Sequence, residues 1–296
     1  MRAAEKGFLL LTSHLGDPQC KPLTVAQFRT LIHRVQSMNK PADNRQMTLQ
    51  DLISLGYGST AAEHILYLLS REEQLEYYVN RSERNACYPI TRISKLYPNA
   101  LRHRLGIDCP GCLWAKGDSS LLDRPAVALV GSRDLLQDNF HFAEEAGRQA
   151  AKQGYVLISG NARGADRTAQ ESCLSSGGQV ISIVADNLSK CRNMPGVLYL
   201  SEDGFDQEFS SIRALSRNRL IHAMGCFTLV AQCSNGRGGT WSGTVQNLRH
   251  QWSPVFCFQD GSDGIRELTH MGANAVDIFD LTDFSQLQKH NITLFD

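Results

Sequence analysis

The fold of this chain is decided by the stretch Val127-Ala128-Leu129-Val130-Gly131-Ser132-Arg133. Its four apolar residues predict a buried strand, and the small residues and the arginine after them predict a loop. A similar arrangement follows later, where the strand Val156-Leu157-Ile158 leads into Ser159-Gly160-Asn161-Ala162-Arg163-Gly164-Ala165-Asp166. In a parallel sheet both loops lie at the same edge, which is the edge where such folds bind ligands.

The two loops predict a ligand that carries phosphate. A guanidinium binds phosphate through two parallel hydrogen bonds, and small residues let the backbone approach the anion. Asp166 falls in the first turn of the helix that follows, so we expect it to cap this helix or to orient an arginine. The site residues expected from these two loops are Gly131, Ser132, Arg133, Ser159, Gly160, Arg163 and Gly164.

Apolar strands alternate with helices from Pro125 onward, which predicts an α/β fold. Short, continuously apolar strands are typical of a parallel sheet that is covered on both faces. The expected class is therefore a Rossmann-like, doubly wound, mostly parallel sheet. The expected strands are 127–130, 155–158, 180–184, 198–200, 227–231, 255–258 and 275–279, and the expected helices are 140–153, one from 165, 211–224 and one around 244–250.

The sequence before this region predicts separate units. Residues 1–80 have apolar positions at helical spacing, with Thr24 as a candidate N-cap, and a helix that breaks at Gly56-Tyr57-Gly58-Ser59. This pattern resembles a SAM-like or helix-hairpin-helix domain, and it also suits a plain helical bundle. Residues 81–122 are expected to be a basic linker and lead-in segment, either solvated or touching nucleic acid. The Rossmann-like domain then covers 123–284, and a C-terminal tail covers 285–296.

Composition restricts the function further. The formal net charge is +0, so any site for an anion must be local. Nine scattered cysteines, no signal peptide and no apolar run long enough for a membrane span predict a cytoplasmic protein with mostly free thiols. Cys109 and Cys112 form a single C-x-x-C pair just before a strand expected at Leu113-Trp114, so we interpret them as structural rather than as a zinc site.

Two further segments supply candidate residues. The glycine-rich run from Ser234 to Thr240 ends a strand and precedes a helix expected to open at Trp241, and its Gly239 and Thr240 suit a third phosphate-binding loop. Arg217 and Arg219 are two positions apart on a helix, so they point to different faces. We expect one of them to reach the ligand edge and the other to form a structural ion pair.

Several common chemistries lack their motifs. The first strand is not followed by G-x-G-x-x-G, which argues against NAD or FAD, and no G-K-[ST] marks a P-loop. The histidines do not form H-E-x-x-H, there is no G-x-S-x-G, and no carboxylate pair stands out as acid and base. We therefore expect no enzyme activity, no cofactor and no metal.

Taken together, these motifs resemble the DNA-processing protein A (DprA/Smf) family. The chain departs from the family pattern at Thr168-Ala169-Gln170, in the loop 238–244 and at Gln259-Asp260, and no winged-helix domain follows Phe279. The matching stretches are Tyr97-Pro98, Leu113-Trp114-Ala115-Lys116-Gly117-Asp118, Val130-Gly131-Ser132-Arg133, Ser159-Gly160 with Ala162-Arg163-Gly164 and Asp166, Ser201-Glu202, and Arg217-Asn218-Arg219-Leu220-Ile221.

The resemblance implies a protein that binds single-stranded DNA during DNA uptake and natural transformation and passes it to the RecA recombinase. It implies that Arg133 and Arg163 clamp backbone phosphates, with Lys190 as a further contact, and that the chain forms a homodimer. An alternative is a nucleotide-binding sensor or a relative of the lonely-guy phosphoribohydrolases, which carry P-G-G-x-G-T-x-x-E. Gly238-Gly239-Thr240 echoes that motif in part, but the expected glutamate is missing because position 243 is glycine.

Overall fold

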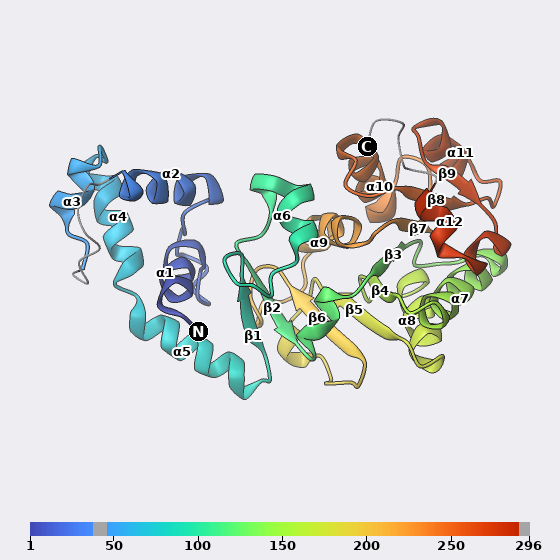
Figure 1. Ribbon diagram of the computed structural model, residues 1–296, viewed down its shortest axis with the longest axis horizontal. Helices are drawn as coiled ribbons and strands as arrows, with labels where there is room; N and C mark the ends of the chain where they lie inside the picture. Colours follow the sequence, from blue (N-terminus) through green and yellow to red (C-terminus); the bar gives the residue numbers. More distant parts are fainter. Residues whose placement is uncertain (38–45, 290–296) are drawn as a thin grey trace.

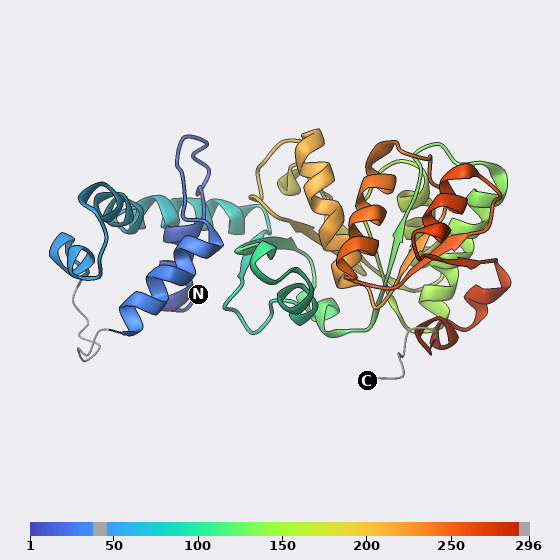
Figure 2. The same ribbon diagram turned by 90° about the horizontal axis from the view of Figure 1, so that it is seen from above.

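A computed structural model describes residues 1–37 and 46–289. A helical unit lies at one end of the molecule, and a sheet flanked by helices makes up the rest (Figures 1 and 2). The strands are β1 (Tyr88–Thr91), β2 (Cys112–Lys116), β3 (Ala126–Val130), β4 (Val156–Ser159), β5 (Gln179–Ile183), β6 (Val197–Ser201), β7 (Thr228–Val230), β8 (Val255–Phe258) and β9 (Asn274–Val276). The helices are α1 (Ala3–Thr12), α2 (Val25–Gln36), α3 (Leu49–Ser54), α4 (Ser59–Leu69), α5 (Glu72–Arg84), α6 (Asn99–Leu105), α7 (Gln137–Lys152), α8 (Ala165–Ser175), α9 (Ser211–Met224), α10 (Gly238–His250), α11 (Asp263–His270) and α12 (Phe284–Lys289).

The described strands form one sheet in the order β1-β2-β6-β5-β4-β3-β7-β8-β9. The chain leaves β3 to one side through β4, β5 and β6, and later returns to pair β7 on the other side of β3. All pairs from β6 to β9 are parallel, whereas β1–β2 and β2–β6 are antiparallel. The predicted Rossmann-like, doubly wound, mostly parallel sheet is confirmed, and its topological switch point lies between β3 and β7.

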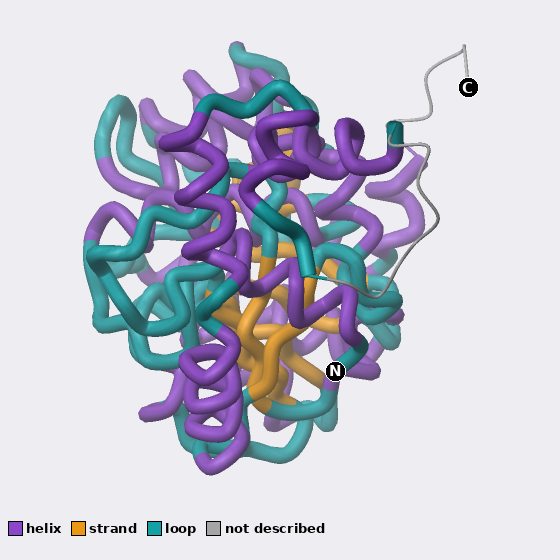
Figure 3. The backbone as a smooth tube through the Cα atoms, turned by 90° about the vertical axis from the view of Figure 1, so that its left-hand side faces the viewer, coloured by secondary structure: helices purple, strands orange, loops and turns teal. Residues whose placement is uncertain are grey.

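Helices cover both faces of this sheet, as the apolar strands require. On β3, Val127 and Leu129 pack into a core with α7 and α8, and their neighbour Ala128 packs into a second core with α9 on the opposite face. Both cores are continuous because side chains alternate between the two faces of a strand. Figure 3 shows the strands enclosed by helices in this way.

The segment 81–122 is not irregular, which corrects the prediction of a linker. It contains β1, α6 and β2, and the two strands extend the sheet beyond β6 in antiparallel fashion. A proline at position 89 argues against a central strand. However, β1 is an edge strand, where a residue without an N–H group is tolerated. The boundaries of the separate domains stay predictions.

The arginines of this segment act mainly on the protein itself. Arg102 donates to the carbonyl oxygens of Arg92 and Ser94, and Arg104 donates to those of Ala223 and Gly225. Buried carbonyl groups at turns and helix ends need such partners. These contacts favour the structural interpretation of the basic residues over a direct contact with nucleic acid.

Other sequence predictions need smaller corrections. Helix α10 begins at Gly238 rather than Trp241, so Gly239 and Thr240 belong to its first turn. The last strand is shorter than expected and is followed by a 3-10 turn over Phe279–Thr282. The expected tail begins with α12, and residues 290–296 lie outside the described residues.

The helical unit has its own small core, formed by residues of α1, α2, α3 and α4. Thr24 caps α2 as predicted, since its hydroxyl accepts from the Gln27 N–H while the Gln27 side chain accepts from the Thr24 N–H. Helix α5 leads from this unit to β1 (Figure 1). Within the described residues, no helix is both long and apolar enough to cross a membrane.

Candidate nucleic-acid interface

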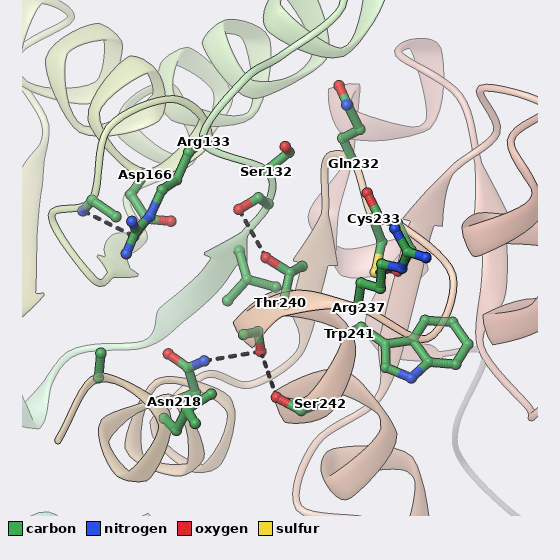
Figure 4. A pocket seen from close by; sticks show the side chains of 18 of the residues that line it. Ser132, Arg133, Asp166, Asn218, Gln232, Cys233, Arg237, Thr240, Trp241 and Ser242 are labelled. Atoms are coloured by element: carbon green, nitrogen blue, oxygen red, sulfur yellow. Dashed lines mark hydrogen bonds between the residues drawn. The ribbon is translucent and has the colours of Figure 1, made fainter. Parts of the chain in front are cut away.

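The loops after β3 and β7 diverge at the switch point and leave a crevice between them. A cavity of about 700 Å³ lies there, and its lining includes Gly131, Ser132 and Arg133 from the first loop and the first turn of α10 from the other side. Figure 4 shows Arg133 and Asp166 on one side of this cavity and Arg237 and Trp241 on the other. The predicted ligand edge of the sheet is therefore hollow in the structure.

A second cavity, of about 660 Å³, continues the first along the ends of β4 and β5. Both cavities are lined by Arg133, Ala162, Phe209, Ala214 and Arg217. The arginines are thus placed where the two cavities meet, and a chain-like ligand has room on either side of them. This arrangement suits a polyanion better than a single isolated phosphate.

Arg217 is held in place by a buried acid. Its guanidinium lies 3.9 Å from the Asp166 carboxylate, and the same carboxylate oxygen accepts hydrogen bonds from the backbone N–H groups of Gly160 and Ala162, each at 3.1 Å. Burial raises the pKa of Asp166, while Arg217 and the two N–H donors oppose that rise. Asp166 therefore shapes the loop and orients an arginine, as predicted.

The glycines of the site serve close packing within the protein. A Cβ atom at Gly160 would overlap the guanidinium of Arg217, and one at Gly164 would overlap the carbonyl oxygens of Ser132 and Arg133. A Cβ at Gly131 would lie 2.5 Å from that of Ala165. These glycines let the two loops and the arginine lie against each other, and close approach of a phosphate at Gly131 and Gly160, which line the cavities, stays a prediction.

The three predicted loops do meet. Thr240 donates its hydroxyl hydrogen bond to the carbonyl oxygen of Gly131 at 2.8 Å, and Asn218 donates to the carbonyl oxygen of Gly239 at 3.0 Å. These bonds link the first loop to the start of α10, and the start of α10 to α9, around the cavity (Figure 4).

The structure places most of the predicted residues around the two cavities, and leaves three outside. Ser159 is fully buried and its hydroxyl accepts from Gln170, Gly164 packs behind the first loop, and Arg219 pairs with Glu202 away from both cavities. Arg217 and Arg219 do point to different faces, as their spacing predicts. The predicted residues that line a cavity are Gly131, Ser132, Arg133, Gly160, Arg163, Lys190, Arg217, Gly239 and Thr240.

Two of these cations are already paired with exposed acids. Arg163 lies 2.7 Å from the Asp134 carboxylate, and Lys190 lies 2.7 Å from that of Glu208. Arg133 is exposed, and among the described residues its guanidinium makes no ion pair or hydrogen bond. Among the described residues that line the cavities, Arg133, Arg167 and Arg237 therefore form no ion pair, whereas the charge of Arg217 is balanced by the buried Asp166.

Sequence reasoning missed the apolar part of the site. Phe209 is 53% exposed although it lines both cavities, and Ile212 and Leu215 continue this exposed apolar ridge along α9. An exposed aromatic ring beside arginines, such as that of Phe209, is typical of surfaces on which bases stack. The available signal was the spacing of three positions from Phe209, just before α9, to Ile212 and Leu215 within it.

The fold and the candidate site define a doubly wound α/β protein with arginines converging at the switch point, and comparison with known proteins agrees with this fold. Residues 89–286 match the family model described as DNA recombination-mediator protein A. The chain therefore belongs to this family, which confirms the resemblance seen in the sequence.

Individual relatives support the same assignment. DNA processing protein DprA of Streptococcus pneumoniae is 28% identical over 205 residues, covering 64% of this chain and 68% of the relative. Its counterpart in Bacillus subtilis is 26% identical over 207 residues, covering 63% and 68%.

Two solved structures share the fold. DprA from Streptococcus pneumoniae matches with a TM-score of 0.69 at 22% identity, over 90% of this chain and 94% of that one. DprA from Helicobacter pylori, whose structure was described for its single-stranded DNA binding mode, matches with a TM-score of 0.57 at 26% identity, over 69% of this chain and 96% of that one.

Proposed function

We propose that this chain binds single-stranded DNA along its two joined cavities and acts without enzyme chemistry as a recombination mediator. The observation that carries the proposal is that Arg133 and Arg217 meet the exposed ring of Phe209 where the cavities join. Arginines bind the phosphates and an exposed ring stacks on bases, so the combination suits a flexible single strand. Binding in this mode is tolerant of sequence and weakens with salt.

The Arg133→Ala variant tests the phosphate contact. We expect its affinity for an oligo-dT of 20 nucleotides to fall about tenfold at low salt, because one charge-assisted contact is lost. Its plot of log affinity against log salt should become shallower by about 0.7, the value for one phosphate on a single strand. Fluorescence anisotropy at several salt concentrations measures both quantities.

The matched control is Arg148→Ala, which removes an exposed arginine near the far end of α7. This variant should keep the affinity and the salt slope of the unmodified chain. If wild-type protein shows no salt-sensitive affinity for the oligonucleotide, or if Arg133→Ala binds as well as Arg148→Ala, the DNA proposal fails.

Asp134 pairs with a cation of the site, so removing its charge should strengthen DNA binding rather than weaken it. Asp134→Asn frees the Arg163 guanidinium, so we expect the affinity for the same oligonucleotide to rise about twofold to fivefold at low salt. Both partners are highly exposed, so stability should barely change. Asp263→Asn, which breaks an equally exposed pair with Arg266, is the control, and an equal effect of the two substitutions would argue against a role for Asp134.

A second candidate function is a nucleotide sensor or a phosphoribohydrolase. It is favoured by the first cavity, whose volume of about 700 Å³ lies in the range for small-molecule sites, about 300–1,000 Å³. Gly243 occupies the position where the hydrolase motif has glutamate, so we expect no release of free base from nucleoside monophosphates. Detection of free base in a chromatographic assay would establish the enzyme instead.

The proposal also includes transfer of the strand to RecA and assembly of the chain into a homodimer. Co-sedimentation with a RecA recombinase in the presence of oligo-dT tests the first, and analytical ultracentrifugation tests the second. Neither result affects the DNA-binding test.

A further inference from the structure

Helix α5 of the helical unit contacts the loop between β6 and α9 through its side chains. This loop covers residues 202–210, and we call it the 202–210 loop. The Tyr78 hydroxyl donates to the Asp206 carboxylate at 2.6 Å, and Arg81 forms an ion pair with the other oxygen of the same carboxylate. The Arg81 guanidinium also lies 5.1 Å from the centre of the Phe205 ring. Each of these contacts joins residues more than a hundred positions apart.

An aromatic cluster fixes the same end of the loop. The ring centres of Tyr78 and Phe205 lie 4.9 Å apart, and both rings pack on Trp114 of β2, at 5.1 and 5.5 Å. All three side chains are almost completely buried. A Cβ atom at Gly204 would lie 2.7 Å from the Tyr78 hydroxyl oxygen, so the chain must be glycine there for α5 to come this close.

The other end of the 202–210 loop belongs to the site. Glu208 accepts from Lys190 and, at 3.0 Å, from Asn187, so it holds a cation of the second cavity. Phe209 lines both cavities. Ser210 caps α9 by accepting from the backbone N–H of Arg213 at 3.1 Å. Only two residues separate Asp206, which α5 holds, from Phe209.

A second anchor keeps the loop folded independently of α5. The Arg213 guanidinium donates to the carbonyl oxygens of Gln207 and Glu208, both at 2.8 Å. Removing the α5 contacts should therefore loosen the 202–210 loop without unfolding it.

We propose that Tyr78 and Arg81 are positioning residues for the candidate nucleic-acid interface: through Asp206 they set the 202–210 loop so that Phe209 faces a base of the bound strand. The helical unit thereby tunes binding without touching the ligand. This inference rests on the proposed DNA-binding function, and it concerns the base contact rather than the phosphate contacts.

The test uses Tyr78→Phe in the full chain, which removes one hydroxyl and keeps the ring. We expect its affinity for oligo-dT to fall about fivefold, less than the full value of a hydrogen bond to a charged group, because Arg81 still pairs with Asp206. Its affinity for an abasic oligonucleotide with the same number of phosphates should stay unchanged, as should the salt slope. Tyr97→Phe is the matched control, because Tyr97 is equally buried and donates to the Pro110 carbonyl oxygen at 2.7 Å, outside both cavities.

A double-mutant cycle shows whether Tyr78 acts through Phe209. Phe209→Ala alone should lose the preference for oligo-dT over the abasic strand, and adding Tyr78→Phe to it should have no further effect. Additive losses, or equal losses for Tyr78→Phe and Tyr97→Phe, would overturn the inference. So would a wild-type protein that binds both strands equally well.

Hydrogen exchange separates this inference from the function on which it rests. Backbone amides of residues 203–210 should exchange faster in Tyr78→Phe than in Tyr97→Phe, with or without DNA. If these amides exchange at unchanged rates while DNA binding is normal, only the positioning role is ruled out. If the wild-type protein binds neither oligonucleotide, the DNA-binding proposal is ruled out, and the role of Phe209 with it.

Discussion

Gly160→Ala is expected to lower the free energy of unfolding by about 3 kcal/mol and to weaken binding of oligo-dT about tenfold or more. The added methyl group would occupy the space of the Arg217 guanidinium, which must then move away from Asp166. Both partners are about nine-tenths buried or more, so separating them leaves an uncompensated charge inside the protein. Urea unfolding measures the stability, and anisotropy measures the binding.

The backbone gives no other reason for such a loss, because Gly160 does not have a positive φ. Gly7→Ala is the matched control. Gly7 lies within α1 with open space around it, and the substitution should raise the helix stability by about 0.5–1 kcal/mol. The cost of Gly160→Ala should also shrink to about 0.5 kcal/mol or less in an Arg217→Ala background, where nothing remains to be displaced. A loss that persists in that background would show that the overlap with Arg217 is not its cause.

The parallel part of the sheet was predictable because its strands are short apolar runs separated by helices. Each run, such as 127–130 or 255–258, is buried on both faces, so its hydrophobicity is continuous and easily recognised. The antiparallel strand β1 was not recognised. It is an edge strand with a proline and partly exposed residues, and its identity as a strand depends on pairing with β2.

The same distinction applies to the site. The positions of Arg133 and Arg217 follow from local rules, since one ends a strand and the other has a fixed angular position on a helix. Ser159 lies outside both cavities, where its hydroxyl accepts a hydrogen bond from Gln170. The role of Gly160 depends on Arg217, fifty-seven positions later in the chain. Such partners come together only through the tertiary fold. The contribution of Phe209 depends in the same way on the two cavities that it separates.

The largest pH effect should come from His222, which lies at the floor of the first cavity. Burial lowers its pKa to about 3, from an ordinary value near 6.5. Below pH 6.5 the unfolded chain takes up a proton at this position and the folded chain does not, so stability falls as the pH falls. From pH 7 to pH 4.5 this residue alone should cost about 3 kcal/mol, at about 1.4 kcal/mol for each pH unit.

The surrounding hydrogen bonds set which nitrogen of this buried ring carries its single proton. The backbone N–H of Ser253 donates to Asn247 Oδ1 at 2.9 Å, which turns Asn247 Nδ2 towards His222 Nδ1, 3.2 Å away. Nδ1 therefore accepts, and the ring carries its single proton on Nε2. A second proton on Nδ1 would place a charge in a completely buried site, so burial opposes it.

His222→Asn tests this account, because an asparagine offers a side-chain acceptor near the position of Nδ1 but does not titrate. At pH 7 we expect the variant to be less stable than the wild type by about 2 kcal/mol, the cost of a smaller side chain in the core. The difference should shrink as the pH falls and change sign near pH 5, because only the wild type loses the stability linked to His222. Urea unfolding from pH 7 to pH 4.5 measures it, with His141→Asn on the surface of α7 as the control for removing one histidine. A difference between His222→Asn and wild type that stays constant over this range would mean that the folded protein accepts the proton at His222, and that the network from Ser253 through Asn247 does not fix the tautomer.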